Sequence, residues 1–552
     1  MDRTSLKFRR NKMKRNLFSS ALLVALLLPT IALAQVKVVI TPQERKMAEA
    51  ITAAQLKDYL YFIAADEMEG RDAPSKGLDI TANFLAMMVS RWGFKPAGDN
   101  GTFFQKIDVR VDTPDAEKTK LAVIGKQFKY GEDFVRVTGT GDASNRPLVY
   151  GGAGWFVKSK GIDDLKGIDV KGKIVVLSAR GMPNMNNLTQ RPAGVTPADL
   201  QGERGVEWAD PLTYATKSGA AGIIVIANEQ INGSWNQVRN AFGRTTLLWE
   251  KLRPDTARTA LPVLLATTSV GNEIMNGMSA GTAADLKHNA SMTVAIKSEM
   301  KKTQNVVALW EGRDPILKKE MVAIGAHYDH VGVNPNAPGD DKIWNGADDD
   351  GSGTVGVLSI AEALAKAPIR PKRSVLIVWH TAEEKGLIGS EYFNKFPTVD
   401  IKNVIANINI DMIGRSKKEG DTDPRNKDLS GPNGTFLIGA ELMSSTLGAV
   451  TLGTNNAYLK LDYDRKYDDP ADTNRFFFRS DHFHYAVNGI PAVFWFTGVH
   501  EDYHQPGDHP DKIDYVKMEK ISRTIFLTLW ELTDLKERPK VDKQLPPELT
   551  RR

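Results

Sequence analysis

Short apolar runs alternate with amphipathic segments in the second half of the chain. The runs Met321–Ala326, Ser374–Trp379, Asn403–Ile410 and Pro491–Phe496 are almost continuously hydrophobic, as strands buried on both faces are. Between the first two lies Gly353–Ala367, whose apolar positions recur at helical spacing. Such alternation is typical of a mainly parallel, doubly wound sheet covered by helices. The sequence therefore predicts an α/β fold that binds ligands at the carboxyl ends of its strands.

The region before residue 300 has two different textures. Apolar residues at helical spacing predict helices over Gln55–Ala65 and Gly77–Trp92, joined by a loop. From about residue 118, short apolar runs between turn residues predict a compact α+β module with strands Lys173–Ser178, Ala221–Ala227 and Leu261–Leu265 and a helix over Trp208–Ser218. We therefore expect a discontinuous domain of residues 35–117 and 299–535, an insert at 118–298, and a loose C-terminal tail at 536–552.

The N-terminus has the pattern of a secretory signal peptide. Basic residues precede the apolar run Leu17–Leu28, and Ala32-Leu33-Ala34 then supplies the small-x-small pattern of a cleavage site before Gln35. A membrane anchor is the weaker interpretation, because about a dozen apolar residues do not comfortably span a bilayer. We expect residues 1–34 to be removed and the protein to be exported to the periplasm or the medium, without a stable membrane anchor.

Composition excludes several classes of function. The 552 residues include no cysteine, which rules out disulfides, thiolate zinc sites, iron–sulfur clusters, cysteine nucleophiles and a lipoprotein anchor. The net charge of +5 comes from residues 1–34, which hold seven of the 72 basic residues and one of the 67 acidic ones. The remaining chain is one unit negative, so its overall charge does not indicate a nucleic-acid partner.

Potential metal ligands follow the predicted strands. Imidazole or carboxylate side chains come directly or shortly after each apolar strand: His327, Asp329, Glu383, Glu384, Asp411 and His504. Three more carboxylates, Asp348, Asp349 and Asp350, lie in the loop before the helix at Gly353–Ala367. Carboxylates crowded at one edge of a sheet repel one another unless cations neutralise them. Histidine and carboxylate without thiolate suit Zn²⁺, with Mn²⁺ or Co²⁺ as possible substitutes. A two-metal site needs a bridging carboxylate and two further ligands for each ion, and the sequence offers such a set.

The order of these motifs resembles metallopeptidase family 28, which comprises secreted bacterial leucyl aminopeptidases, glutamate carboxypeptidase and relatives. The resemblance rests on six motifs and covers about residues 45–110 and 303–530: His-x-Asp, Gly-Ala-Asp-Asp-Asp-Gly-Ser-Gly, Ala-Glu-Glu-x-Gly-Leu-x-Gly-Ser, Asp-Met, Ser-Asp-His and Asp-Tyr-His. The insert resembles a protease-associated domain in DDLKGIDVKGKIVVL and SGAAGIIVIAN. The resemblance implies the fold of the zinc aminopeptidases.

The resemblance also implies how two zinc ions are held. Asp349, three residues before Ser352, corresponds to the carboxylate that bridges the two ions. His327 and Asp411 complete one site, and Glu384 and His504 complete the other.

Three further residues receive roles from the same resemblance. Glu383 corresponds to the general base, which takes a proton from the attacking water and passes it to the leaving amine. Asp329 corresponds to the residue that accepts a hydrogen bond from His327 and fixes its tautomer. Tyr503, beside His504, is a candidate stabiliser of the transition state.

Neighbouring polar residues are assigned simpler roles. Asp348 and Asp350 are expected to shape the loop, and the Asp349–Asp350 peptide bond is expected to be cis, as it often is in the family. Ser480-Asp481-His482 is not expected to form a nucleophilic triad, because triad members are normally distant in sequence. The remaining histidines of this region are interpreted as loop or packing residues: His330, His380, His484, His500 and His509.

The resemblance implies a secreted two-zinc exopeptidase acting on peptides, and an aminopeptidase is favoured. Two alternatives are a glutaminyl cyclase with a single zinc and a non-catalytic binding protein like the transferrin receptor. Carboxypeptidase and dipeptidase activities also occur on this scaffold, so substrate polarity depends on the loops at 412–475. Four basic residues in or near these loops could bind a substrate carboxylate: Lys460, Arg465, Arg475 and Arg479.

Overall fold

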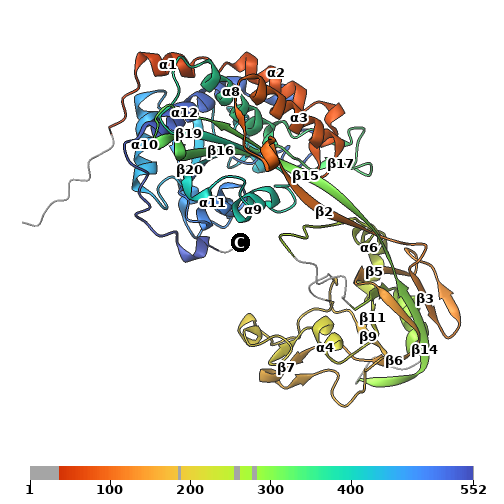
Figure 1. Cartoon of the computed structure of the whole chain (residues 1–552). Coiled ribbons are helices and arrows are strands. Elements are labelled where there is room, and N and C mark those ends of the chain that lie inside the picture. Colours follow the sequence, from red (N-terminus) through yellow and green to blue (C-terminus); the bar gives the residue numbers. More distant parts are fainter. Residues whose placement is uncertain (1–36, 184–187, 254–260, 277–282, 551–552) are drawn as a thin grey trace, which may run out of the picture.

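The predicted apolar strands form the centre of the main sheet in the computed structural model (Figure 1). They are parallel neighbours in the order β19, β16, β20, β23, with bounds Ser374–His380, Met321–His327, Val404–Ile410 and Ala492–Phe496. All of their residues are buried, which explains why their sequences are apolar without alternation. The α/β fold class is therefore confirmed. The structure describes residues 37–183, 188–253, 261–276 and 283–550, so the predicted signal peptide lies outside them.

Antiparallel strands extend the sheet on both sides of this parallel centre. β15 pairs antiparallel with β19 at one side, and β21 pairs antiparallel with β23 at the other. The sheet as a whole is thus mixed, since strand direction in the flanks depends on chain connections and not on apolar content. The flanking strands are β1 (Lys95–Pro96), β2 (Phe104–Pro114), β12 (Thr246–Leu248), β15 (Ile296–Trp310), β21 (Gly434–Ile438) and β22 (Asp462–Asp464).

Helices cover both faces of the sheet. Alternate residues of β16 separate the two layers, because Val322 and Ile324 pack into the cluster of one side and Ala323 into that of the other. On the first side lie α1 (Pro42–Ala48), α2 (Ala53–Ile63), α3 (Lys76–Arg91), α8 (Gly353–Lys366), α10 (Ser445–Ala457) and α12 (Tyr515–Asp534). On the second side lie α9 (Ile388–Lys395) and α11 (His482–Val487). Among the described residues, no helix has both the length and the apolar character needed to cross a membrane.

Capping residues determine where the two predicted N-terminal helices begin. The Thr52 side chain accepts a hydrogen bond from the Gln55 backbone N–H at 3.2 Å, and the Gln55 side chain accepts one from the Thr52 N–H. At α3 the Ser75 hydroxyl accepts a hydrogen bond from the Leu78 backbone nitrogen at 3.2 Å. Both helices are therefore found within two residues of their predicted bounds.

A second sheet is built from the insert, with its own apolar clusters on its two faces. Its order is β4, β3, β14, β6, β9, β11, β13, β5, with bounds Lys126–Phe128, Lys120–Val123, Ala284–Val294, Gly141–Tyr150, Ile174–Ser178, Gly222–Ile226, Val263–Ala266 and Phe134–Thr138. A small three-stranded sheet consists of β7 (Phe156–Val157), β8 (Ile162–Asp163) and β10 (Trp208–Ala209). The helices of this body are α4 (Pro211–Lys217), α5 (Glu229–Gly233), α6 (Trp235–Phe242) and α7 (Thr268–Met275). The three predicted strands of this body are thus present.

The connection between the two bodies differs from a simple linker. Figure 1 shows that the long strands β2 and β15 run from one body into the other. The predicted boundary at residues 298 and 299 therefore falls inside a continuous strand, β15. Residues of the insert also contact the main body. Strand β12 pairs with β2, and Arg253 forms an ion pair with Glu391 of α9 at 2.7 Å.

The C-terminal residues, expected to form a loose tail, contact the main body. Leu549 is buried in the cluster that contains Phe436 and Phe496. The Asp542 carboxylate accepts hydrogen bonds from the backbone and the hydroxyl of Ser445, at the start of α10. Although this segment is polar and rich in proline, its few apolar side chains fix it against the surface.

Glu531 on α12 is expected to make stability depend on pH. Burial and the charges of Glu44 and Asp534 raise the pKa of its carboxyl from 4.5 to about 7. Between these values the folded state keeps a proton that the unfolded state releases, so the free energy of unfolding falls as pH rises. After allowance for partial solvation, Glu531→Gln should stabilise the protein by about 1–2 kcal/mol at about pH 8 and not at about pH 4. Urea unfolding at both pH values would measure the change in the free energy of unfolding, with Glu537→Gln, at an exposed position, as control. An equal change for Glu531→Gln at the two pH values would contradict the prediction.

Candidate active site

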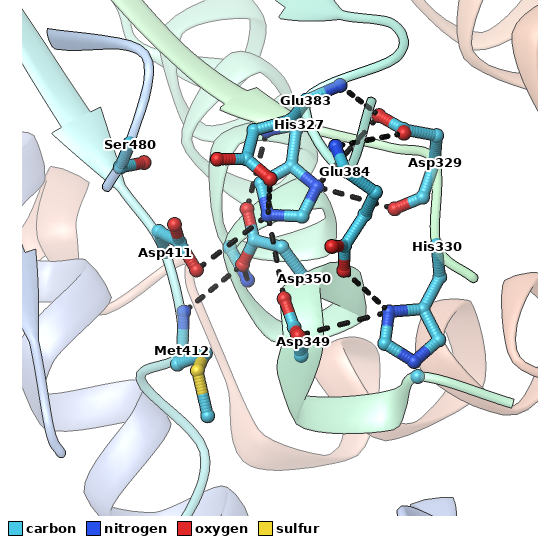
Figure 2. A network of polar contacts seen from close by, with 12 residues as sticks. His327, Asp329, His330, Asp349, Asp350, Glu383, Glu384, Asp411, Met412 and Ser480 are labelled. Atoms are coloured by element: carbon cyan, nitrogen blue, oxygen red, sulfur yellow. Dashed lines mark hydrogen bonds and ion pairs between the residues drawn. The ribbon is translucent and has the colours of Figure 1, made fainter. Parts of the chain in front are cut away.

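The carboxyl ends of the parallel strands bring the predicted ligands together (Figure 2). His327 is the last residue of β16, and Asp411 directly follows β20. Glu383 and Glu384 lie in the turn after β19, whereas Asp349 lies in the loop before α8. Because parallel strands end at one edge of the sheet, residues distant in the sequence converge there.

One group of possible metal ligands consists of His327, Asp349 and Asp411, all buried. The Nε2 atom of His327 lies 3.4 Å from Oδ1 of Asp349 and 3.6 Å from Oδ1 of Asp411. These separations place an imidazole nitrogen and two carboxylate oxygens around one point.

A second group shares Asp349 and adds Glu384, His504 and His330. Nε2 of His504 lies 3.1 Å from Oδ2 of Asp349 and 3.0 Å from Oε1 of Glu384. Nδ1 of His330, interpreted from the sequence as a packing residue, lies 3.1 Å from the same Glu384 oxygen. The structure therefore brings all five predicted ligands together and adds His330, whose position three residues after His327 was the available signal.

The donor set fits divalent cations. Burial and the charges of Glu384 and Asp411 raise the pKa of Glu383 well above its usual value. Burial opposes protonation of His504, but its contacts with Asp349 and Glu384 raise its pKa to about 10. The raised pKa values of His327 and His504 favour imidazoles that balance part of the charge of this carboxylate cluster, and a bound cation would take over that role after displacing their protons. Nitrogen and oxygen donors without sulfur fit Zn²⁺.

Hydrogen bonds from backbone nitrogens to two carboxylates fix the loop that carries Asp349. The Asp508 carboxylate accepts from the backbone nitrogens of Asp348 at 2.9 Å and Asp349 at 3.1 Å. The Asp350 carboxylate accepts from the nitrogens of Gly353 at 2.9 Å and Met412 at 3.1 Å. Asp348 and Asp350 therefore shape the loop, as expected, and the peptide bond between Asp349 and Asp350 is cis, as expected.

Asp329 makes a different set of contacts from the one expected. Nδ1 of His327 lies 3.1 Å from the backbone carbonyl oxygen of Asp329 and 3.8 Å from its carboxylate. The carboxylate instead accepts from the backbone nitrogens of Glu383 at 3.0 Å and Glu384 at 3.3 Å. One residue thus orients the imidazole through its carbonyl and the two glutamates through its side chain.

Arg71 is a structural residue of the site that the sequence did not reveal. It is fully buried, and its guanidinium donates to the carbonyl oxygens of Ile63, Tyr328, Asn345 and Gly346 at 2.7–3.0 Å. These contacts tie the loop after α2 to the segments that carry the ligands. No signal in the sequence predicted this role, because an arginine in a loop such as Glu69-Gly70-Arg71 is usually solvated.

A cavity of about 200 Å³ opens onto both ligand groups. Besides the ligand residues, Glu383 and Gly386, its wall includes the apolar side chains of Met412, Phe476, Phe494, Phe496 and Val499. Tyr503 and Arg479 complete it. The Tyr503 ring stacks on His504 at a centroid distance of 4.0 Å, and its hydroxyl accepts a hydrogen bond from Nη2 of Arg479 at 3.0 Å.

The Ser480-Asp481-His482 segment borders this cavity without forming a triad. The Ser480 hydroxyl accepts a hydrogen bond from Nδ2 of Asn409 at 2.7 Å. The His482 ring stacks on Phe494 at 4.7 Å, and burial lowers its pKa to about 3. A neutral imidazole that packs against phenylalanine has a structural role, and the segment forms no triad, as expected.

Comparisons with known proteins identify similar sequences and folds. Residues 305–529 match the model of Peptidase family M28. A probable leucine aminopeptidase 2 of Aspergillus fumigatus is 29% identical over 315 residues, 55% of this chain and 52% of that protein. A probable leucine aminopeptidase 2 of Aspergillus oryzae is 31% identical over 38% of this chain and 37% of its own length. The chain spans about half the length, or less, of these curated relatives.

Two solved structures align with most of the chain at lower sequence identity. The aminopeptidase from Aneurinibacillus sp. strain AM-1 is 17% identical with a TM-score of 0.49, over 91% of this chain and 98% of that one. A zinc aminopeptidase from Bacillus subtilis is 16% identical with a TM-score of 0.45, over 90% of this chain and 99% of that one.

Proposed function

Because residues 305–529 belong to peptidase family M28, we propose that this protein is a two-zinc aminopeptidase that hydrolyses the N-terminal residue of peptides. The observation that carries the proposal is the position of Asp349, which belongs to both ligand groups. A carboxylate shared between two groups of nitrogen and oxygen donors is the arrangement that a pair of bridged metal ions requires.

His327, Asp349 and Asp411 would hold one ion, and Asp349, Glu384 and His504 the other. Zinc in these positions would supply Lewis acidity that polarises the scissile carbonyl and makes the attacking water more acidic. His330 contacts Glu384 and would orient that carboxylate.

Glu383 is the proposed general base. Its side chain lines the cavity and lies 3.9 Å from Nε2 of His327, beside the ligands. Burial raises its pKa, which makes it better able to take a proton from water and return it to the leaving amine. Burial and the charge of Asp349 also raise the pKa of Tyr503, so its hydroxyl stays protonated and can donate to the developing oxyanion.

The lining of the cavity supports an aminopeptidase with a preference for apolar residues. Methionine, phenylalanine and valine side chains favour an apolar side chain on the substrate.

The remaining parts of the chain receive proposals of the same kind. Residues 1–34 would direct export and then be removed, leaving the mature enzyme in the periplasm or the medium. Residues 118–298 would form a protease-associated domain, which limits access to the site of the discontinuous domain at 35–117 and 299–535.

Metal content and a small panel of substrates test this function. We expect about two zinc ions per chain, hydrolysis of Leu-nitroanilide but not of N-blocked Leu-nitroanilide, and at least a ~100-fold loss on chelation that added zinc reverses. Activity confined to N-blocked substrates would indicate cleavage from the C-terminal end of the peptide and contradict an aminopeptidase. A single zinc with cyclisation of N-terminal glutamine would support a glutaminyl cyclase, and no hydrolysis after zinc loading would support a binding protein.

A further inference from the structure

One basic residue lies in the wall of the catalytic cavity. Of the four basic residues considered from the sequence, only Arg479 is among the described residues that line it. Lys460, Arg465 and Arg475 are not among its lining residues; Arg465 forms an ion pair with Glu441, and Arg475 lies over the ring of Phe478 at 4.4 Å. The tertiary structure thus selects one candidate for binding an anionic group.

Aromatic rings hold the Arg479 guanidinium in place. It lies 4.8 Å from the ring centroid of Phe476 and 5.7 Å from that of Tyr503, and donates to the Tyr503 hydroxyl. A guanidinium has five N–H donors in a fixed fork, so this contact leaves donors free for a carboxylate. The residue is exposed and can be reached from solvent.

Arg479 lies close to the ligand groups. Tyr503 links it to His504, since the tyrosine ring stacks on His504 at 4.0 Å and its hydroxyl accepts a hydrogen bond from Arg479 at 3.0 Å. This separation is the length of one aromatic side chain. An extended peptide advances about 3.3–3.6 Å per residue, so a carboxylate one or two residues beyond the scissile bond can reach the guanidinium.

The charges in the cavity are also separated. The carboxylates of Asp349, Glu384 and Asp411 belong to the ligand groups and would be neutralised by the metal ions, whereas the guanidinium lies on the wall. A dipeptide at neutral pH carries an ammonium at one end and a carboxylate at the other. Its carboxylate lies within reach of the guanidinium, whereas a long peptide or an amide has no carboxylate at that position.

We propose that Arg479 binds the C-terminal carboxylate of very short peptides, so that dipeptides with an apolar N-terminal residue are the preferred substrates. This inference rests on the proposed aminopeptidase function and specifies its substrate class. Arg479 is a specificity residue in this proposal, because it contacts the end of the substrate and not the reacting carbonyl.

The test compares Leu-Gly with Leu-Gly-amide, which differ only in the terminal carboxylate. With the zinc-loaded full-length protein, we expect kcat/KM to be about 10- to 100-fold higher for Leu-Gly, the effect of one charge-assisted pair. Arg479→Gln should bring this ratio close to one, Arg479→Lys should keep part of it, and Arg475→Gln should leave it at the wild-type value. Because the ratio is measured, any loss common to both substrates through Tyr503 cancels.

The outcomes distinguish this inference from the function on which it rests. Equal kcat/KM for the two substrates in the wild type, or an unchanged ratio in Arg479→Gln, would overturn the role of Arg479 while leaving an aminopeptidase. If neither substrate nor Leu-nitroanilide were hydrolysed by the zinc-loaded protein, the proposed function would fail and the inference with it.

Discussion

Glu383→Gln is expected to lower kcat for Leu-nitroanilide by about 10²–10⁴-fold, the usual contribution of a positioned general base. The amide is close in size to the carboxylate and cannot accept the proton of the attacking water. Because Glu383 belongs to neither ligand group, bound zinc should remain at the wild-type level. The effect should appear in kcat and leave KM almost unchanged, since the group acts mainly in the transition state.

Stopped assays with matched metal analysis would measure this effect. Glu419→Gln, an exposed glutamate in the loops beside the site, is the matched control and should behave as the wild type. A Glu383→Gln enzyme with wild-type kcat would assign the proton transfer to another residue. A variant that lost its zinc as well would indicate that Glu383 supports the ligands.

Asp349→Asn is expected to remove metal and activity together. Asp349 is the one residue shared by the two ligand groups among the described residues, so its loss weakens both. A neutral amide also leaves the imidazoles of His327 and His504 without the carboxylate that each contacts. We expect at most one zinc per chain and a fall in kcat/KM of at least ~10³-fold, because several kcal/mol of metal stabilisation are lost.

Elemental analysis and the Leu-nitroanilide assay would measure both effects on the same preparation. Circular dichroism should show that the variant is folded, and the exposed Asp340→Asn provides the control in the preceding segment. Two zinc ions with full activity in Asp349→Asn would refute the bridging role. If Asp349→Asn lost only one of the two zinc ions and kept the other as tightly as the wild type, Asp349 would be a ligand to one ion only.

The sequence by itself was sufficient for the centre of the fold and for the residues that meet at the edge of its sheet. Strands buried on both faces must be apolar at successive positions, so β16, β19, β20 and β23 were visible as continuous runs. Parallel strands end at one edge, so polar residues placed directly after them had to meet, and His327 and Asp411 did. Cap residues such as Ser75 marked helix starts, because they satisfy backbone groups locally.

The tertiary structure decided everything that depends on how separate loops pack. His330, Arg71 and Asp508 resemble ordinary loop residues in the sequence, and their roles come from partners far along the chain: Glu384, Asn345 and Asp349. Likewise the sequence offered four basic residues for a carboxylate, and the packing of Phe476 and Tyr503 selected Arg479. Local patterns record which residues are buried or cap a helix, whereas contacts between distant segments are set only when the sheet and its helices assemble.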